Sequence, residues 1–218
     1  MEKKQNSECW YHEVCKMENS CSSCIRYIEM KHLMECSGIP KAKQRPIELY
    51  PDDVDYDSFV KLRDIKDGIV DFVGSGENLY ICGGTGNGKT SWAIKLLLRY
   101  FDQVWAGNGF RTRGVFVHVP TILLQLKDFN NPLSAEYKQS LMSADVVVWD
   151  EIAGVGMSNY DYSQLLMYID SRMLNEKSNI FTSNVCKHAD LQFKMGSRIA
   201  SRIWNGSTRI ELKGRDKR

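Results

Sequence analysis

Three clusters of residues in this chain of 218 amino acids have the chemistry of a binding or catalytic site. The first is a glycine-rich run, G-G-T-G-N-G-K-T, at residues 83–90. The second is a pair of adjacent acids, Asp150 and Glu151, and the third is a group of five cysteines within the first 36 residues. The glycine-rich run predicts a phosphate-binding loop, and the acid pair predicts one acid that binds a metal and one that polarises a water. The cysteines predict a metal site or a disulfide.

The glycine-rich run fits the pattern G-x-x-x-x-G-K-[ST], lies after an apolar run at 79–82 and precedes a stretch with helical spacing. Glycines let several backbone N–H groups converge, and a helix N-terminus adds positive charge, so the loop suits nucleotide phosphates. We expect Lys89 to contact the β- and γ-phosphates of ATP and Thr90 to donate an oxygen ligand to Mg²⁺. The expected nucleotide-binding residues are Gly83, Gly84, Thr85, Gly86, Asn87, Gly88, Lys89 and Thr90.

The acid pair directly follows the apolar run Val146–Trp149, which is the Walker B pattern. Asp150 is expected in the Mg²⁺ shell, and Glu151 is expected to polarise a water for attack on the γ-phosphate. This arrangement favours ATP hydrolysis over transfer to a substrate. The alternative is that both acids cap a strand end and face solvent.

Short runs rich in β-branched or aromatic residues predict an α/β fold with a five-stranded parallel sheet. The expected strands lie at 79–82, 115–119, 146–149, 180–182 and, as an edge strand, 208–212. Apolar residues at helical spacing around 94–101, 122–126 and 166–173 predict helices between them. The expected strand at 115–119 lies in sequence between the P-loop strand and the Walker B strand. This order of strands resembles the AAA+ (ASCE) branch of P-loop ATPases. Asn184, after the strand at 180–182, is the candidate sensor residue.

Arg198 and Arg202 lie four residues apart, with Ile199 and Ile203 at the same spacing on a neighbouring helix face. Such a pair can act as an arginine finger in the site of an adjacent subunit, or can form an ordinary solvated basic face. Only 34 residues (218 minus 184) follow Asn184, which predicts a module without a C-terminal helical lid.

Together these motifs resemble the DnaC/DnaI family of replicative helicase loaders, which are relatives of the IstB transposition ATPases. The resemblance covers about residues 75–218 and includes T-S-N at 182–184, S-R-I-A-S-R-I at 197–203 and the closing I-E-L-K-G-R-D-K-R. It implies that Lys89, Asp150, Glu151 and Asn184 serve ATP turnover and that Arg198 or Arg202 makes the contact in trans. It also implies a hexameric replicative helicase and single-stranded DNA as partners. Copies of this chain would assemble on the helicase through their own ATP sites.

The N-terminal cysteines predict a small zinc-binding unit. Cys9, Cys15, Cys21 and Cys24 have the spacing C-x5-C-x5-C-x2-C, and four thiolates suit one Zn²⁺ in a segment too short for its own core. His12, His32 or Cys36 can replace one ligand, and a disulfide or unliganded thiols are the alternatives. Some DnaI-like loaders resemble this chain in having a zinc-binding unit that docks on the helicase.

The net charge of +2 does not by itself indicate a nucleic-acid partner, but its distribution is uneven. Residues 186–218 carry nine bases against three acids, whereas residues 51–75 carry seven acids against three bases. With Arg111, Arg113 and Lys127, the basic bias is compatible with a groove for single-stranded DNA. No apolar run approaches the roughly 20 residues of a membrane span, and no secretory signal is recognisable, so we expect a cytoplasmic protein.

The expected organisation is a zinc-binding docking unit at 1–36, a linker at 37–58 with three of the five prolines, and an AAA+ ATPase domain at 59–218. The leading functional hypothesis is an ATP-dependent loader of a hexameric replicative helicase onto single-stranded DNA. The alternatives are an IstB-like ATPase that regulates a transposase and a nucleotide-binding adaptor that does not hydrolyse ATP.

Overall fold

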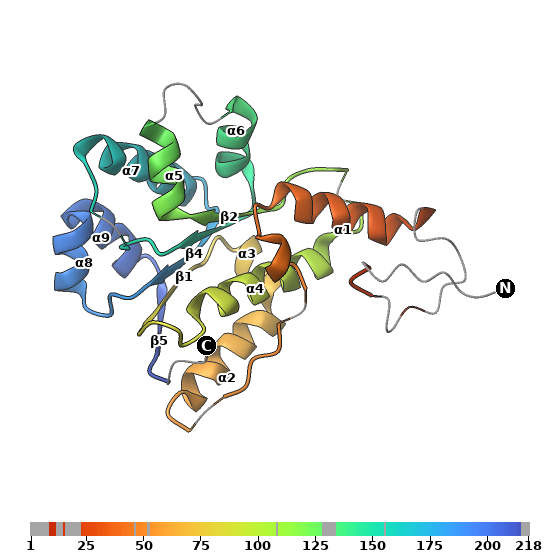
Figure 1. The fold of residues 1–218 in the computed structure, drawn as a ribbon, viewed down its shortest axis with the longest axis horizontal. Helices are drawn as coiled ribbons and strands as arrows, with labels where there is room; N and C mark the ends of the chain where they lie inside the picture. The colour runs from red at the N-terminus through yellow and green to blue at the C-terminus, as the bar shows by residue number, and fades with distance from the viewer. Residues whose placement is uncertain are drawn as a thin grey trace.

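The computed structural model describes residues 9–11, 15, 23–45, 47–51, 53–107, 109–127, 134–154 and 156–214. A central β-sheet lies between two layers of helices (Figure 1). Within these residues, no helix combines the length and the apolar composition that crossing a membrane requires.

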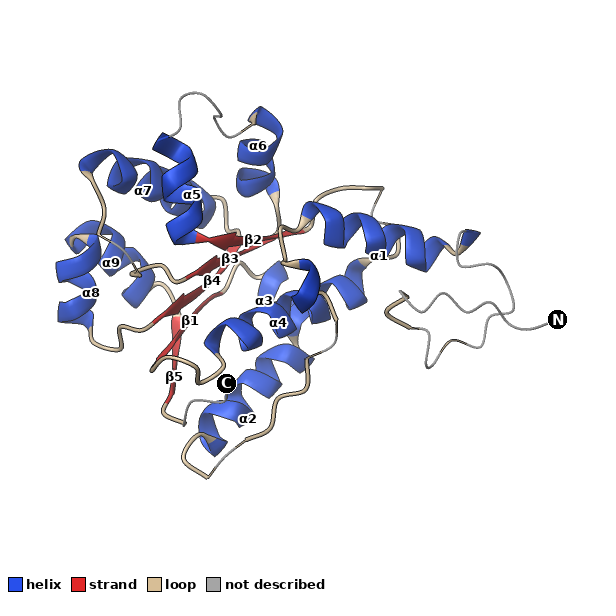
Figure 2. Ribbon diagram, viewed as in Figure 1, coloured by secondary structure: helices blue, strands red, loops and turns tan. Residues whose placement is uncertain are grey.

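The sheet has five parallel strands in the order β2-β3-β4-β1-β5 (Figure 2). All five predicted strands are confirmed, and β5 lies at an edge as expected. Because every strand runs in the same direction, all carboxyl ends meet at one edge of the sheet, where ligands of open α/β sheets bind. The strands are β1 (Asn78–Gly83), β2 (Gly114–His118), β3 (Val146–Asp150), β4 (Ser178–Ser183) and β5 (Thr208–Leu212).

Alternate residues of each strand face opposite layers, so the sheet separates two apolar cores. Leu79 and Ile81 face one core, whereas Tyr80 and Cys82 face the other. The first core is covered by α1 (Ile25–Cys36), α2 (Tyr56–Asp67), α3 (Ile69–Gly74) and α4 (Lys89–Val104). The second is covered by α5 (Val119–Lys127), α6 (Ala135–Ser143), α7 (Asn159–Leu174), α8 (His188–Met195) and α9 (Ser197–Asn205).

The segment before the ATPase motifs packs onto this framework. Met30, Leu33 and Met34 of α1 are buried in the same core as α4. Ser37 is fully buried, and its carbonyl accepts a hydrogen bond from the Phe116 amide of β2 at 2.6 Å. The division of the chain at residues 36 and 58 stays a prediction, but α1 and the residues after it share a core with the P-loop helix.

A buried arginine fixes α7 against the start of β4. Arg172 is fully buried, and its guanidinium donates to the Asn179 side chain at 2.8 Å. It also donates to three backbone carbonyls, those of Leu141, Ala144 and Ser178, at 2.7, 2.9 and 2.6 Å. One side chain therefore satisfies buried acceptors at the end of α6 and at the start of β4.

Replacing Arg172 by methionine should destabilise the fold by about 3 kcal/mol or more, because it leaves several buried acceptors without donors. Urea unfolding measures this loss. Arg63→Met is the matched control, since the Arg63 side chain is 51% exposed and pairs with its neighbour Asp64 at 3.6 Å. An equal stability of the two variants would contradict the role assigned to Arg172.

Candidate nucleotide-binding site

The glycine-rich loop links the carboxyl end of β1 to the N-terminus of α4, as the motif predicts. Gly83 has a φ of +148°, and a Cβ there would collide with the Leu212 carbonyl of β5. Gly88 precedes α4 with a φ of +95°, which favours glycine. The Asn87 amide donates to the Leu212 carbonyl at 2.5 Å and thereby fastens the loop to β5. The conformation of the loop is thus fixed by its glycines and by the Asn87 side chain.

Lys89 is buried at the first turn of α4, with an exposed fraction of 8%. Its ammonium donates to the carbonyls of Gly83 and Gly84 at 3.0 and 2.5 Å. Burial lowers the pKa of Lys89, although the nearby acids Asp150 and Glu151 oppose this effect. An ammonium held in a poorly hydrated loop at a helix N-terminus is suited to pair with phosphate oxygens.

Asp150 is the point at which three elements meet. Its Oδ1 accepts hydrogen bonds from the Thr90 hydroxyl of α4 at 2.8 Å and the Thr182 hydroxyl of β4 at 2.7 Å. Asp150 is the last residue of β3 and is only 4% exposed. A hydroxyl and a carboxylate in contact are the oxygen donors that Mg²⁺ prefers, so Thr90 and Asp150 fit the predicted metal.

Glu151 adopts a left-handed backbone conformation with a φ of +57°, which is uncommon for a residue with a side chain. Its amide donates to Thr182 Oγ1 at 3.0 Å, which holds the turn in place. Glu151 Oε2 lies 3.4 Å from Nε2 of His118 at the end of β2, and His118 Nδ1 lies 2.7 Å from Thr121 Oγ1. Neither His118 nor Thr182 was predicted from the sequence as a site residue.

The glycine-rich loop lines a pocket with a volume of about 620 Å³. Glu151 and Asn184 line it together with the loop residues Lys89 and Thr90. Residues 47–51, which were predicted to be part of a linker, form the remaining wall of the pocket. The structure therefore brings together the predicted loop, acid pair and sensor, and adds a wall from the N-terminal side of the chain.

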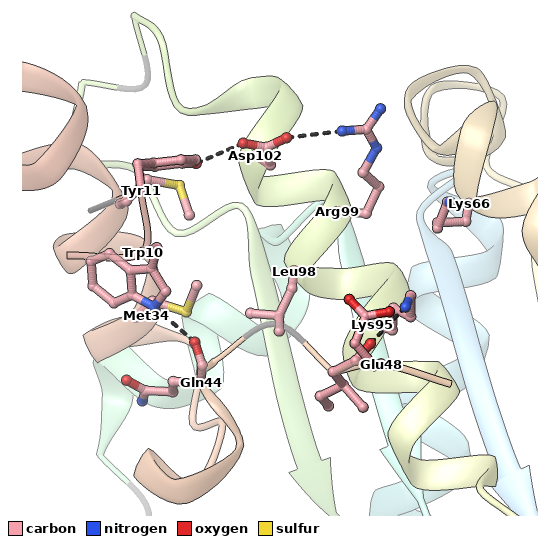
Figure 3. A pocket seen from close by; sticks show the side chains of 12 residues that line it. Trp10, Tyr11, Met34, Gln44, Glu48, Lys66, Lys95, Leu98, Arg99 and Asp102 are labelled. Carbon is pink, nitrogen blue, oxygen red and sulfur yellow. Dashed lines mark hydrogen bonds and ion pairs between the residues drawn. The ribbon is translucent and has the colours of Figure 1, made fainter. Parts of the chain in front are cut away.

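A second pocket of about 470 Å³ lies behind this wall (Figure 3). Ile47 and Glu48 line both pockets. The Lys95 ammonium of α4 donates to the Ile47 carbonyl at 2.6 Å, which fastens the wall to the P-loop helix. On the far side, the Trp10 indole donates to the Gln44 carbonyl at 2.7 Å.

Near the second pocket, Asp102 of α4 holds the N-terminal residues. Its Oδ1 accepts from the Tyr11 hydroxyl at 2.6 Å and from Arg26 at 2.8 Å, and its Oδ2 accepts from Arg99 at 2.9 Å. Partial burial alone would raise the pKa of Asp102, but the Tyr11 and Arg26 hydrogen bonds outweigh it and hold that pKa below its ordinary value. One helix therefore carries the P-loop at its start and this anchor near its end.

The two candidate finger arginines lie on α9, outside the residues that line the nucleotide pocket. Both pair with Asp170 of α7, but unequally: Arg202 Nε lies 2.7 Å from Oδ1, whereas Arg198 lies 3.6 Å from Oδ2. The Arg198 side chain is also the more exposed, at 65% against 49%. Arg198 is thus held less tightly within its own chain.

Three of the four predicted zinc ligands, Cys9, Cys15 and Cys24, lie within the described residues. Cys21 and His12 lie outside the described residues. Among the residues that the structure does describe, no three His, Cys, Asp or Glu side chains gather as a metal site. The zinc site stays a prediction.

The basic residues proposed for DNA contact have acidic neighbours in the structure. Asp145 pairs with Arg111 at 3.0 Å and with Arg113 at 2.6 Å. Lys127 pairs with the buried Asp161 at 2.7 Å. Part of their positive charge is neutralised within the chain, so a DNA groove at these positions stays a prediction.

The strand order and the site define the chain as a P-loop nucleotide-binding protein of the AAA+ type. Residues 25–215 match the family model described as "IstB-like ATP binding protein". The chain belongs to this family, and the resemblance inferred from the motifs is confirmed. The matched range begins after the four predicted zinc ligands.

Solved structures with the same fold include helicase loaders. The chain matches the DnaC helicase loader with a TM-score of 0.65 and 20% identity, over 76% of this chain and 94% of that chain. It matches DnaI with a TM-score of 0.66 and 19% identity, over 86% and 100% of the two chains. It also matches a primosome component of Streptococcus pyogenes serotype M3, described as putative, with a TM-score of 0.60 and 23% identity. This match covers 86% of this chain and 98% of that chain. No curated protein matches the chain significantly.

Replacing Lys95 by methionine should weaken ATP binding about fivefold, because one hydrogen bond that holds the 47–51 wall is lost. The affinity for inorganic tripolyphosphate should not change, because the phosphate loop is intact. Calorimetric titration with both ligands measures the difference.

The matched control for this variant is Lys66→Met. Lys66 lines the same second pocket but forms an ion pair with Asp67 at 3.0 Å instead of holding the wall. A parallel loss of affinity for ATP and tripolyphosphate in Lys95→Met would contradict the role of the wall.

Proposed function

We propose that this chain is an ATPase that loads a ring-shaped replicative helicase onto single-stranded DNA. The observation that carries the ATPase part is that Lys89, Thr90 and Glu151 line one pocket, with Asp150 hydrogen-bonded to Thr90. The loader part is supported by the likeness to DnaC and DnaI over nearly the whole of those chains. A cytoplasmic location and an N-terminal zinc unit that docks on the helicase belong to the same proposal.

In the proposed reaction, Lys89 and the loop amides bind the phosphates and orient the γ-phosphate. Bound Mg²⁺, held by Thr90 and Asp150, would neutralise developing charge on the phosphates. Glu151 accepts a proton from the attacking water, and Asn184 helps to orient that water. The amide contact with Thr182 and the imidazole of His118 fix the position of Glu151, so both act as positioning residues.

Arg198 is the proposed trans-acting group. It is the more exposed arginine and the one held less tightly by Asp170. A guanidinium from a neighbouring copy would stabilise charge on the γ-phosphate and make turnover dependent on assembly. ATP turnover would then report that the loader copies are correctly arranged on the helicase.

The second candidate function is regulation of a transposase, which the IstB-like family match favours. The two hypotheses share the ATP site and differ in the partner. Native mass spectrometry with the replicative helicase of the same cell, in Mg-ATP and in ADP, separates them. A nucleotide-dependent complex with several copies per hexamer supports the loader, whereas no complex in either state would contradict it and favour the transposase.

Replacing Glu151 by glutamine should lower ATP turnover about 100-fold or more while ATP still binds, since only the proton acceptor is lost. The control is Glu176→Gln, because Glu176 also has a left-handed backbone, with a φ of +52°, but does not line the pocket. Single-turnover assays and calorimetry measure the two effects. Unchanged turnover would support the adaptor that does not hydrolyse ATP.

A mixture of Arg198→Ala and Lys89→Ala should regain turnover that neither variant has alone. The first keeps an intact ATP site, the second keeps an intact arginine, and a mixed assembly contains complete sites. The assay is ATP hydrolysis in the presence of the helicase. Mixtures no more active than the separate variants would show that Arg198 does not act in trans.

A further inference from the structure

The second pocket, behind the wall of the nucleotide site, has two chemically different ends. Figure 3 shows Trp10, Met34 and Leu98 on one side of it and the charged side chains of Lys66 and Arg99 on the other. The volume of about 470 Å³ is typical of small-molecule sites. A cavity with an apolar end and a cationic end suits a molecule that is apolar at one end and anionic at the other.

The apolar end has the side chains that accept a flat ring. Met30 and Met34 of α1 and Leu98 of α4 line it. Thioether side chains adapt to ligands of different outline and make favourable contacts with aromatic rings. The Trp10 indole N–H donates to the Gln44 carbonyl at 2.7 Å. This hydrogen bond fixes an aromatic ring at the same end, against which a flat ligand can stack.

The charged end is lined by three cations, and two of them keep much of their positive charge. The Lys95 ammonium donates to the Ile47 carbonyl at 2.6 Å, and a neutral carbonyl does not compensate that charge. Lys66 pairs with Asp67 at 3.0 Å, but the Asp67 side chain is 57% exposed. Ion pairs with so much access to water are weak, so Lys66 is available to an anionic ligand.

The third cation, Arg99, also lines the pocket. One of its terminal nitrogens donates to Asp102 Oδ2 at 2.9 Å. Its Nε is buried and has no hydrogen-bond partner among the residues that the structure describes. A buried N–H group without an acceptor is unfavourable, and a carboxylate bound in the pocket would supply one. The lining carries only two acids, Glu48 and Asp102, against the three cations.

We propose that the second pocket binds a small aromatic carboxylate, with its ring beside Trp10 and its carboxylate at Lys66 and Arg99. Binding of this ligand does not depend on the nucleotide site. Its effect on ATP does, because one wall lines both pockets, and this part of the proposal rests on the proposed nucleotide site.

The shared wall gives the ligand an effect on ATP. Ile47 and Glu48 line both pockets. A ligand in the second pocket therefore supports from behind the wall that faces ATP. Whichever ligand binds first restricts the wall, so the other binds with a smaller loss of conformational entropy. Each ligand should raise the affinity of the other by the same factor, about fivefold.

The test titrates the full chain, labelled with ¹³C at the methionine methyl groups, with naphthoate, a flat fused ring that carries one carboxylate. We expect the methyl signals of Met30 and Met34 to shift. The signal of Met195, which is buried in the other core, should not shift. Naphthamide, an uncharged ligand of the same shape, should bind about tenfold more weakly because it lacks the charged contacts.

Lys66→Met should weaken naphthoate binding about fivefold without weakening naphthamide binding. The matched control is Arg63→Met, which removes a cation of the same helix that does not line the pocket. Unmoved Met30 and Met34 signals, or an equal shift of Met195, would overturn the proposal. Equal affinities for naphthoate and naphthamide would overturn the assignment of a carboxylate.

Calorimetric titration with ATP, with and without saturating naphthoate, tests the effect on the nucleotide site. We expect ATP to bind about fivefold more tightly in the presence of naphthoate, and naphthoate about fivefold more tightly in the presence of ATP. Naphthoate bound beside Met30 and Met34 without any change in ATP affinity would overturn this part. No ATP binding with or without naphthoate would instead contradict the proposed nucleotide site.

Discussion

The contact between the Asp150 carboxylate and the hydroxyls of Thr90 and Thr182 is the interaction on which the nucleotide site depends. It joins the P-loop helix to β3 and β4 through distances of 2.8 and 2.7 Å. A buried carboxylate is stable only when it is hydrogen-bonded or paired, so the two hydroxyls permit Asp150 to lie at the carboxyl edge of the sheet. Thr182 extends the same network to the Glu151 amide and thereby positions the second acid.

The parallel sheet makes this contact possible. In the order β2-β3-β4-β1-β5, β4 lies between the Walker B strand and the P-loop strand. Residues that are more than 60 positions apart in the chain therefore meet at one edge, as Lys89 and Glu151 do. The helix α4 connects that edge with the N-terminal part of the chain. It begins at Lys89, and Asp102 near its end accepts a hydrogen bond from the Tyr11 hydroxyl.

Much of this arrangement could be predicted from local sequence patterns. The glycine-rich loop, the acid pair and the five strands each depend on residues that are adjacent in sequence, and all of these elements are present. The helix α2 was not predicted because only Leu62 of its 12 residues is buried, which leaves no apolar stripe to recognise. His118 and the 47–51 wall were missed for a different reason, since their roles arise from contacts between distant segments.

Residues N-terminal to the P-loop also form part of the nucleotide pocket. One wall separates the ATP pocket from the second pocket, and Lys95 holds that wall to the P-loop helix. A change at either pocket can therefore reach the other through a few residues.

The most direct measurement of the central claim is anomalous diffraction from crystals grown with a non-hydrolysable ATP analogue and Mn²⁺ in place of Mg²⁺. The account predicts one manganese peak in the pocket, bonded to the Thr90 hydroxyl oxygen, with the Asp150 carboxylate in its ligand shell directly or through a water. A manganese ion elsewhere, or an analogue bound without contact to the glycine-rich loop, would contradict it.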